Sequence, residues 1–247
     1  LYSAPWRIGF FVLTLYPIVY SFYLMFTDMN LTGVGKFIGL ENLKYAFTDD
    51  PLFIKAFINT LKYVVMFVPS SIILAFFVAL LLSKKVKGLG FFRTAFYIPY
   101  ITSGVAVTIL WGWIYQKDYG IINYVLSLFG IKGVNWLGDK NIAMISIVIL
   151  SLWTIGNNII IMLAGIQDIP QSYYESAQID GAGAIRQIFS ITLPLCTPTI
   201  YFNLIVTIIA AFQVFQQPLI LTNGGPLNST YTAAIHMYNN GFLYGKM

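Results

Sequence analysis

The sequence predicts an all-α integral membrane protein, built as a polytopic bundle of membrane-spanning helices. Of its 247 residues, 58% are hydrophobic and only 9% are charged, and the mean hydropathy is +0.75. Soluble globular domains carry about 25% charged residues, so this chain lies outside their range. A helix needs about 20 apolar residues to cross a hydrocarbon core. Five stretches without Asp, Glu, Lys or Arg reach that length, at 8–27, 63–83, 94–116, 141–167 and 187–245.

Turn-forming residues divide the longest of these stretches. Thr-Asn-Gly-Gly-Pro at 222–226 and Asn-Ser-Thr at 228–230 are typical of turns, so we expect a polar loop there, after a helix that ends near residue 221. Residue 1 is Leu and no apolar span follows the fifth, so we expect a fragment whose sixth span comes after residue 247. The predicted spans of this single transmembrane domain, 1–247, are about 6–27, 59–83, 94–116, 141–164 and 196–221.

The connection between the second and third spans predicts the orientation of the chain. Its basic residues, with no acid among them, are Lys84, Lys85, Lys87 and Arg93. Short connections rich in Lys and Arg stay on the cytoplasmic side of a membrane. Alternation then places the N-terminus and the connection 167–195 on that side as well. The connections expected to face outward are 28–58, 116–141 and 222–240.

The cytoplasmic connection 167–195 carries small, charged and apolar residues in an unusual order. It reads Glu-Ser-Ala at 175–177 and Asp-Gly-Ala at 180–182, with Leu-Pro at 193–194. We expect a short helix over 173–179, a turn at Asp180-Gly181 that uses a positive φ at the glycine, and a second helix over 182–191 that ends at Leu-Pro. Small residues permit close approach by another protein. The apolar residues expected to contact that protein are Ile179, Ile185, Ile188 and Phe189.

This order resembles the cytoplasmic EAA loop of ABC transporter permeases, with Ser176 in place of the family's second alanine. Further segments resemble the binding-protein-dependent sugar permeases, so the resemblance covers essentially the full chain. By pattern it is nearest to importers of maltose, maltodextrin and other oligosaccharides. The resembling segments are Tyr16-Pro17, Ser21-Phe22, Phe26-Thr27-Asp28, 37–42, Asn59-Thr60, 93–99 and 222–226.

The resemblance implies a helical bundle of the ABC importer permease type in the cytoplasmic membrane of a prokaryote. Its function would be ATP-driven, binding-protein-dependent uptake of maltodextrin-like oligosaccharides. Its partners would be a dimer of ATP-binding cassette subunits, a second homologous permease, an extracytoplasmic solute-binding protein and the lipid bilayer. The loop would dock on the ATPase through Glu175, Ser176, Ala177, Asp180, Gly181 and Ala182.

No Walker-type phosphate loop occurs in the sequence, so we expect a transport subunit that is not an enzyme and has no cofactor of its own. ATP would be bound by the partner subunits. Lone His236 and single Cys196 indicate no metal site. The dispersed positive charges indicate no role with nucleic acid.

Polar and aromatic side chains within the last two spans predict a substrate path, because such groups in a membrane face a cavity or a partner. The same groups also join membrane helices, at about 0.6 kcal/mol each, and this alternative stays open. The resemblance places sugar-contacting positions on Thr154, Asn157, Thr207, Ala210, Ala211 and Val214. The residues assigned to the path are Trp153, Thr154, Asn157, Asn203, Thr207, Ala211, Gln213 and Val214.

Two other functions remain open at this stage. A permease of the same type could carry glycerol phosphate, which would favour a cationic group in the path. A self-sufficient secondary carrier or channel would instead need no ATPase. Purification separates these possibilities, because an ABC permease is isolated together with an ATPase and a carrier transports alone.

Overall fold

The computed structural model describes residues 3–29, 35–84 and 88–245. Two of the four basic residues used to predict the orientation, Lys85 and Lys87, lie outside these ranges. The chain divides into two compact units, one formed by 1–57 with 233–247 and the other by 58–232.

The first unit begins with a continuous helix, Ala4–Leu24, which is long and apolar enough to cross a membrane. It ends before residue 27, where the predicted span ends, because Thr27 pairs with Phe37 in a two-stranded antiparallel sheet. The Asn42 side chain also donates to the carbonyl oxygens of Met25 and Thr27, at 3.1 and 2.9 Å. The helical and strand elements of this part are α1 (Ala4–Phe10), η1 (Phe11–Leu15), α2 (Tyr16–Leu24), β1 (Thr27–Asp28), β2 (Lys36–Phe37), α3 (Glu41–Lys44) and η2 (Tyr45–Asp49).

The end of the described chain belongs to the same unit and is also helical. It forms α15 (Ala233–Tyr238) and η4 (Asn239–Leu243), so the polar loop predicted for 222–240 ends earlier than expected. In this unit Nε2 of His236 lies 3.2 Å from Oδ2 of Asp50.

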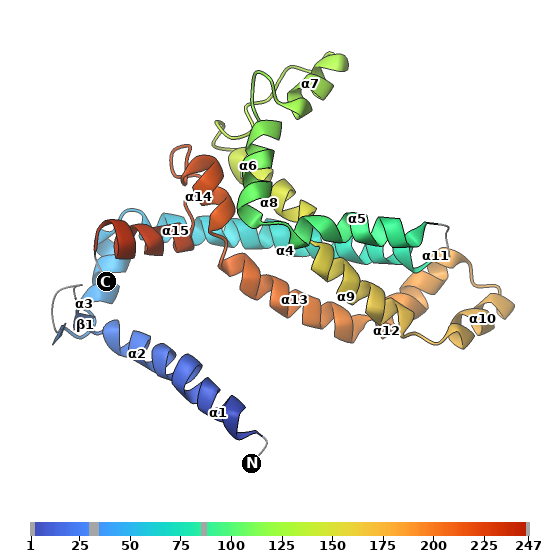
Figure 1. The fold of residues 1–247 in the computed structure, drawn as a ribbon, viewed down its shortest axis with the longest axis horizontal. Helices are drawn as coiled ribbons and strands as arrows, with labels where there is room; N and C mark the ends of the chain where they lie inside the picture. The colour runs from blue at the N-terminus through green and yellow to red at the C-terminus, as the bar shows by residue number, and fades with distance from the viewer. Residues whose placement is uncertain (1–2, 30–34, 85–87, 246–247) are drawn as a thin grey trace. The chain divides into compact units, whose positions relative to one another are not determined.

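The long helix α4 (Phe53–Ser83) belongs to the second unit from residue 58 onward, and Figure 1 shows other helices of that unit running beside it. Its core contains small residues of α4, Ala75 and Ala79, packed with Met162, Ile159 and Cys196, all buried. The elements that follow α4 are α5 (Leu89–Ile101), α6 (Gly104–Ile114), α7 (Ile121–Leu128), α8 (Ala143–Trp153), α9 (Gly156–Gln167), α10 (Gln171–Ile179), α11 (Ala184–Gln187), η3 (Ile188–Thr192), α12 (Leu193–Leu195), α13 (Thr197–Phe212) and α14 (Gln216–Thr222).

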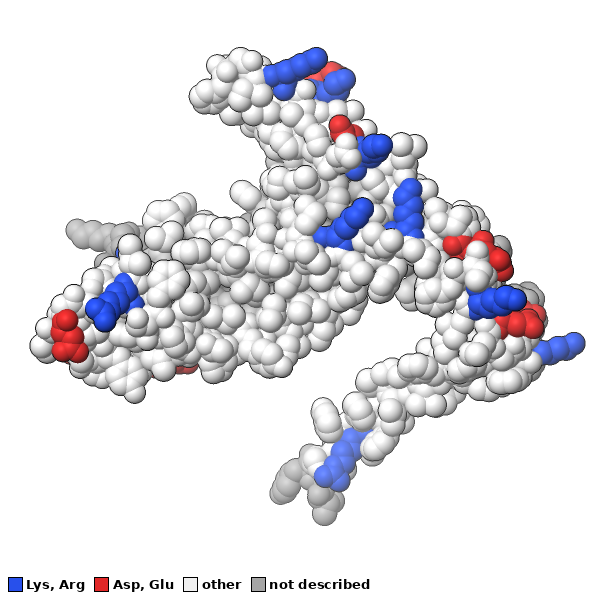
Figure 2. Space-filling view, turned by 180° about the vertical axis from the view of Figure 1, so that it is seen from behind, with Lys and Arg blue, Asp and Glu red and all other residues white. Residues whose placement is uncertain are grey.

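Three further candidate spans are bent pairs of helices. The pair α5 and α6 meets at 99°, and the pair α8 and α9 meets at 51°. The helix Ala184–Leu195 meets α13 at 65°. Together with Ala4–Leu24 and α4, these pairs give up to five membrane spans among the described residues, judged by length and composition. Figure 2 shows a broad face without charged side chains over the long helices, as a lipid-facing surface requires.

The predicted helix 196–221 is wrong, because the structure divides it. The helix α13 ends at Phe212 and α14 begins at Gln216. Pro218 has no N–H, so it cannot donate to the carbonyl oxygen of Val214 four residues earlier. The Thr232 hydroxyl donates to this carbonyl instead, at 3.0 Å. The break therefore has a local cause and a partner that is distant in the sequence.

Glycine allows α9 to approach its neighbours closely. A Cβ at Gly156 would lie 2.5 Å from the carbonyl oxygen of Phe96 on α5, a distance that real side chains essentially never show. A Cβ at Gly165 would meet the Thr199 hydroxyl near the start of α13. Small residues at helix contacts are typical of membrane bundles, because they permit close backbone packing.

Candidate functional site

The connection 167–195 contains the turn predicted from its sequence. The helix α10 follows Pro170 and includes the predicted residues 173–179. Gly181 has φ +77°, and its N–H donates to the Gln178 carbonyl oxygen at 3.0 Å. The N–H of Ala182 donates to the Ala177 carbonyl oxygen at 2.8 Å. The left-handed conformation at Gly181 thus ends α10 and redirects the chain.

The second helix of this connection is longer than predicted. It begins at Ala184, two residues later than predicted, and runs through η3 and α12 to Leu195, one residue beyond the predicted end at Leu-Pro 193–194. Pro194 is tolerated because it lies in the first turn of α12, which follows the wider π-helical turn η3. The change of direction comes at Cys196, before α13.

One side-chain contact joins the two limbs of this loop, and a second joins the second limb to the turn. The Tyr174 hydroxyl on α10 lies 2.9 Å from the hydroxyl of Thr192, which is 2% exposed. The Gln187 amide donates to the carbonyl oxygen of Ala182 at 2.8 Å. We call residues 171–195, which lie within the predicted loop 167–195, the coupling loop, after the role that the sequence resemblance implies. The loop is therefore held by hydrogen bonds between its own residues, which restrict its internal motion.

The coupling loop exposes large apolar side chains that a water-facing loop does not need. Ile179 is 88% exposed, Ile185 is 74% exposed and Phe189 is 63% exposed. Exposed apolar residues of this size mark interaction surfaces when they gather on one element. Ile188 differs from its neighbours, because it is half-buried and packs against the core around α4 and α9. Ile188 therefore offers less surface to a partner than Ile179, Ile185 and Phe189 do.

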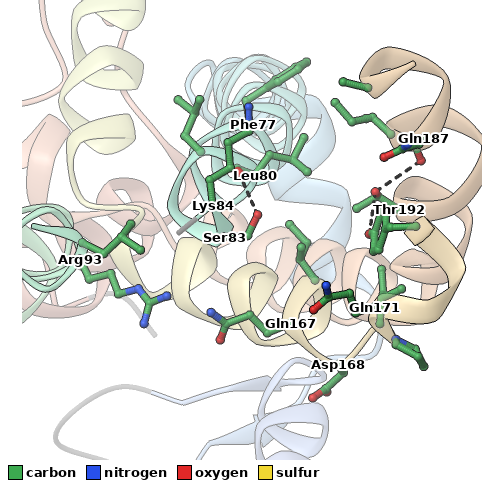
Figure 3. Close-up of a pocket in the computed structure, with 18 residues that line it drawn as sticks. Phe77, Leu80, Ser83, Lys84, Arg93, Gln167, Asp168, Gln171, Gln187 and Thr192 are labelled. Carbon is green, nitrogen blue, oxygen red and sulfur yellow. Dashed lines mark hydrogen bonds between the residues drawn. The ribbon is translucent and has the colours of Figure 1, made fainter. Parts of the chain in front are cut away.

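A pocket of about 890 Å³ lies between the coupling loop and the ends of three helices. Its walls come from the last turns of α4, the first turns of α5 and the end of α9, together with α10, α11 and η3 (Figure 3). The polar and charged side chains among its lining residues are Ser83, Lys84, Arg93, Gln167, Asp168, Gln171, Tyr174, Gln187 and Thr192.

The residues assigned to the substrate path separate into two groups. Those on α13 and just after it, Asn203, Thr207, Ala211 and Val214, are buried within the unit. The Thr207 hydroxyl accepts a hydrogen bond from the Asn158 amide at 2.9 Å, so this pair joins α13 to α9. Nδ2 of Asn203 is buried and has no hydrogen-bond partner in the part of the chain that is described.

The other path residues are open to the surface. Trp153 is 58% exposed and packs edge to face with Trp111, with the ring centres 5.9 Å apart. Thr154 and Asn157 are half-buried and Gln213 is exposed. The Thr154 hydroxyl donates to the Ser151 carbonyl oxygen within the break between α8 and α9. These side chains lie where two pairs of helices are interrupted.

The loop 222–232 contains the predicted turns and is fixed to α4 by a residue whose role was not predicted. Asn223, Leu227 and Asn228 have positive φ, as does Gly224. The buried Asn59 amide donates to the carbonyl oxygens of Asn228 and Tyr231, at 2.8 and 3.1 Å. Sequence reasoning noticed Asn59 only as part of a resemblance. The sequence signal that could have identified Asn59 is its position, since it is a polar residue at the start of an apolar span.

Comparison with known proteins identifies the class of this fold. A family described as "Binding-protein-dependent transport system inner membrane component" matches residues 51–247. The chain is 38% identical over 250 residues to "Probable ABC transporter permease protein YesP" of Bacillus subtilis (strain 168), with 100% of this chain and 81% of that protein covered. It is 34% identical over 254 residues to "Arabinooligosaccharides transport system permease protein AraP" of the same organism, with 100% and 79% covered.

A solved structure has the same fold. It is "Crystal structure of a bacterial ABC transporter involved in the import of the acidic polysaccharide alginate", with a TM-score of 0.81 at 24% identity. The similarity covers 98% of this chain and 82% of that one. The chain therefore belongs to the family of inner-membrane permease components of binding-protein-dependent ABC transporters. The predictions of family, helical membrane fold and membrane location are confirmed.

Proposed function

We propose that this chain is the permease subunit of an ATP-driven importer for sugars, with maltodextrin-like oligosaccharides as the substrate class. The observation that carries the proposal is the coupling loop, which is internally bonded yet exposes Ile179, Ile185 and Phe189. The sugar assignment is supported by the relative named for arabinooligosaccharides and by the resemblance of the loop and turn segments.

The coupling loop would dock on an ATP-binding cassette subunit, one of two in the assembly. The residues Glu175, Ser176, Ala177, Asp180, Gly181 and Ala182 form the end of α10 and the turn, which are exposed or half-buried. Small side chains let the ATPase approach the backbone, and the exposed apolar residues add contact area. The second limb runs from Ala184 to Leu195 without interruption and then meets α13 at 65°. A push on the loop would thus move α13.

The substrate path would be lined from this chain by Trp153, Thr154, Asn157 and Gln213. Aromatic faces suit the C–H patches of sugars, and amide and hydroxyl groups match sugar hydroxyls, which both donate and accept. A second permease would supply the opposite wall. The outer loop 222–232, held by Asn59, would face the extracytoplasmic solute-binding protein.

Purification and reconstitution test this function. The chain is expressed with its neighbouring transport genes, purified, and reconstituted in liposomes with ATP inside and labelled maltodextrin outside. We expect co-isolation with an ATPase and uptake that depends on both ATP and a solute-binding protein. Uptake by the isolated chain without ATP would instead identify a self-sufficient carrier. Uptake of glycerol phosphate in preference to the sugar would change the substrate class.

A further inference from the structure

The pocket behind the coupling loop combines a charged rim with an apolar wall. Its charged lining residues in the described part of the chain are Lys84 and Arg93, against one acid, Asp168. The two cations come from the end of α4 and the start of α5, which flank the same connection. If this connection faces the cytoplasm, as its basic residues predict, the pocket would lie at the level of the inner leaflet headgroups.

Arg93 is incompletely bonded in this pocket. One terminal nitrogen donates to the carbonyl oxygen of Leu82 at 3.3 Å. Its Nε is buried and has no hydrogen-bond partner among the described residues. Figure 3 shows the guanidinium reaching from α5 toward Gln167 at the end of α9. A guanidinium offers five N–H donors in a planar fork that matches phosphate oxygens. A phosphate in the pocket would supply the missing acceptor.

The apolar wall continues a lipid-facing stripe of α4. Leu74, Phe77 and Leu81 follow helical spacing on one face and are 41%, 55% and 65% exposed. Phe77 and Leu81 also line the pocket. The stripe therefore leads along α4 from the membrane to the cationic rim. A free phosphate would make no contact with this apolar wall, whereas the acyl chains of a phospholipid would pack against it.

We propose that this pocket binds an anionic phospholipid of the inner leaflet. Arg93 and Lys84 hold its phosphate, and the acyl chains lie along Phe77 and Leu81. Basic pockets between membrane helices on the cytoplasmic side bind anionic headgroups in this way. Since the other walls come from α10, α11 and η3, the lipid would contact the coupling loop from behind. The site is independent of which sugar is transported.

Lipid titration of the assembled transporter tests the proposal. The complex with its partner subunits is purified in detergent, and phosphatidylglycerol or phosphatidylcholine is titrated while native mass spectrometry counts bound lipid. We expect tighter binding of phosphatidylglycerol. Arg93→Gln should raise its dissociation constant about tenfold, as loss of one charge-assisted contact predicts. Lys84→Gln should act in the same direction, while Arg93→Lys retains most of the binding.

Matched controls keep the result interpretable. Lys132→Gln changes an exposed lysine outside the pocket and should leave lipid binding unchanged. Lys84 is exposed, so Lys84→Gln still gives a readout if Arg93→Gln does not accumulate. Equal affinity for the two lipids, or unchanged binding in Lys84→Gln and Arg93→Gln, would overturn the proposal. If inorganic phosphate displaced the bound phosphatidylglycerol, the pocket would be a site for a free anion, and the lipid proposal would be wrong. Absence of bound lipid from the assembled transporter would also overturn the proposal.

Discussion

The hydroxyl groups of Tyr174 and Thr192 lie 2.9 Å apart and connect the two limbs of the coupling loop. Thr192 is buried, whereas the loop around it is largely exposed. A force applied to α10 therefore reaches the second limb through this contact as well as through the turn at Gly181. In the proposed function, transmission of movement through the loop would therefore depend on a few identified groups.

Removing the Tyr174 hydroxyl should weaken coupling without preventing assembly. Tyr174→Phe deletes one hydrogen bond, worth about 1 kcal/mol, and leaves Thr192 with its weaker contact to Gln187. We expect ATP-driven sugar uptake to fall several-fold in proteoliposomes, with the ATPase still co-purifying. Tyr173→Phe is the matched control, because Tyr173 is 52% exposed and should tolerate the change. Equal uptake by the two variants would contradict the role given to this contact.

Gly181 should be sensitive to side-chain addition because of its backbone conformation. Its φ of +77° costs a residue with a Cβ about 1–2 kcal/mol, although no atom lies within 4 Å of the site. Gly181→Val should insert in the membrane but lose most ATP-driven uptake.

Gly183 supplies the control for this position. It is two residues away, also has open space, and has φ −67° and ψ 165°, which valine adopts readily. Gly183→Val should keep most uptake. If the two valine variants lost uptake equally, sensitivity of the loop to size would replace the conformational explanation.

The contact of α9 with α5 should be sensitive at Gly156. Gly156→Ala forces a Cβ against the Phe96 carbonyl oxygen and should cost about 1–3 kcal/mol, seen as a lower midpoint of thermal unfolding in detergent. Gly90→Ala, on α5 with no atom within 4 Å, should leave the midpoint unchanged or raise it slightly. If the midpoint fell equally in both variants, backbone flexibility of glycine would explain the loss of stability, and close packing at Gly156 would not.

The break after α13 should depend on Thr232. Thr232→Val keeps the shape of the side chain but leaves the Val214 carbonyl oxygen without its donor. Since Thr232 is 1% exposed, we expect a loss of about 1–3 kcal/mol in unfolding free energy. Thr94→Val is the control, because Thr94 is exposed and donates to a carbonyl oxygen of its own helix. An unchanged midpoint in Thr232→Val would show that water replaces the bond.

Variants of the adjacent residues Asn157 and Asn158 distinguish contact with the substrate from packing between helices. The Asn158 side chain donates to Thr207, whereas the Asn157 side chain is half-buried and makes no hydrogen bond to the described residues. We expect Asn157→Leu to raise the sugar concentration for half-maximal uptake while the unfolding midpoint stays the same. Asn158→Leu should lower the midpoint. If Asn157→Leu lowered the unfolding midpoint and Asn158→Leu changed only the sugar concentration for half-maximal uptake, Asn157 would be a packing residue and not part of the proposed path.

Local properties of the sequence were sufficient for much of the fold and of the coupling loop. Membrane insertion depends on the length and composition of apolar stretches, so the candidate spans could be predicted within a few residues at several ends. The turn at Gly181 was predictable because positive φ is a property of single residues. Pro218 was an equally local signal for the break before α14, but the predicted helix 196–221 ran through it.

Contacts between distant segments were decided only by the tertiary structure. The sequence left open whether Thr207 meets sugar or another helix, and the bond from Asn158 shows that it joins α9. Asn59 and Thr232 contact backbone carbonyls that are distant in the sequence, and no local pattern predicts such partners. By itself the sequence determined that the chain crosses a membrane and that residues 167–195 contain a helix and a glycine turn. The structure decided which polar side chains are used internally, because each buried polar group needs a partner whose position depends on the packed helices.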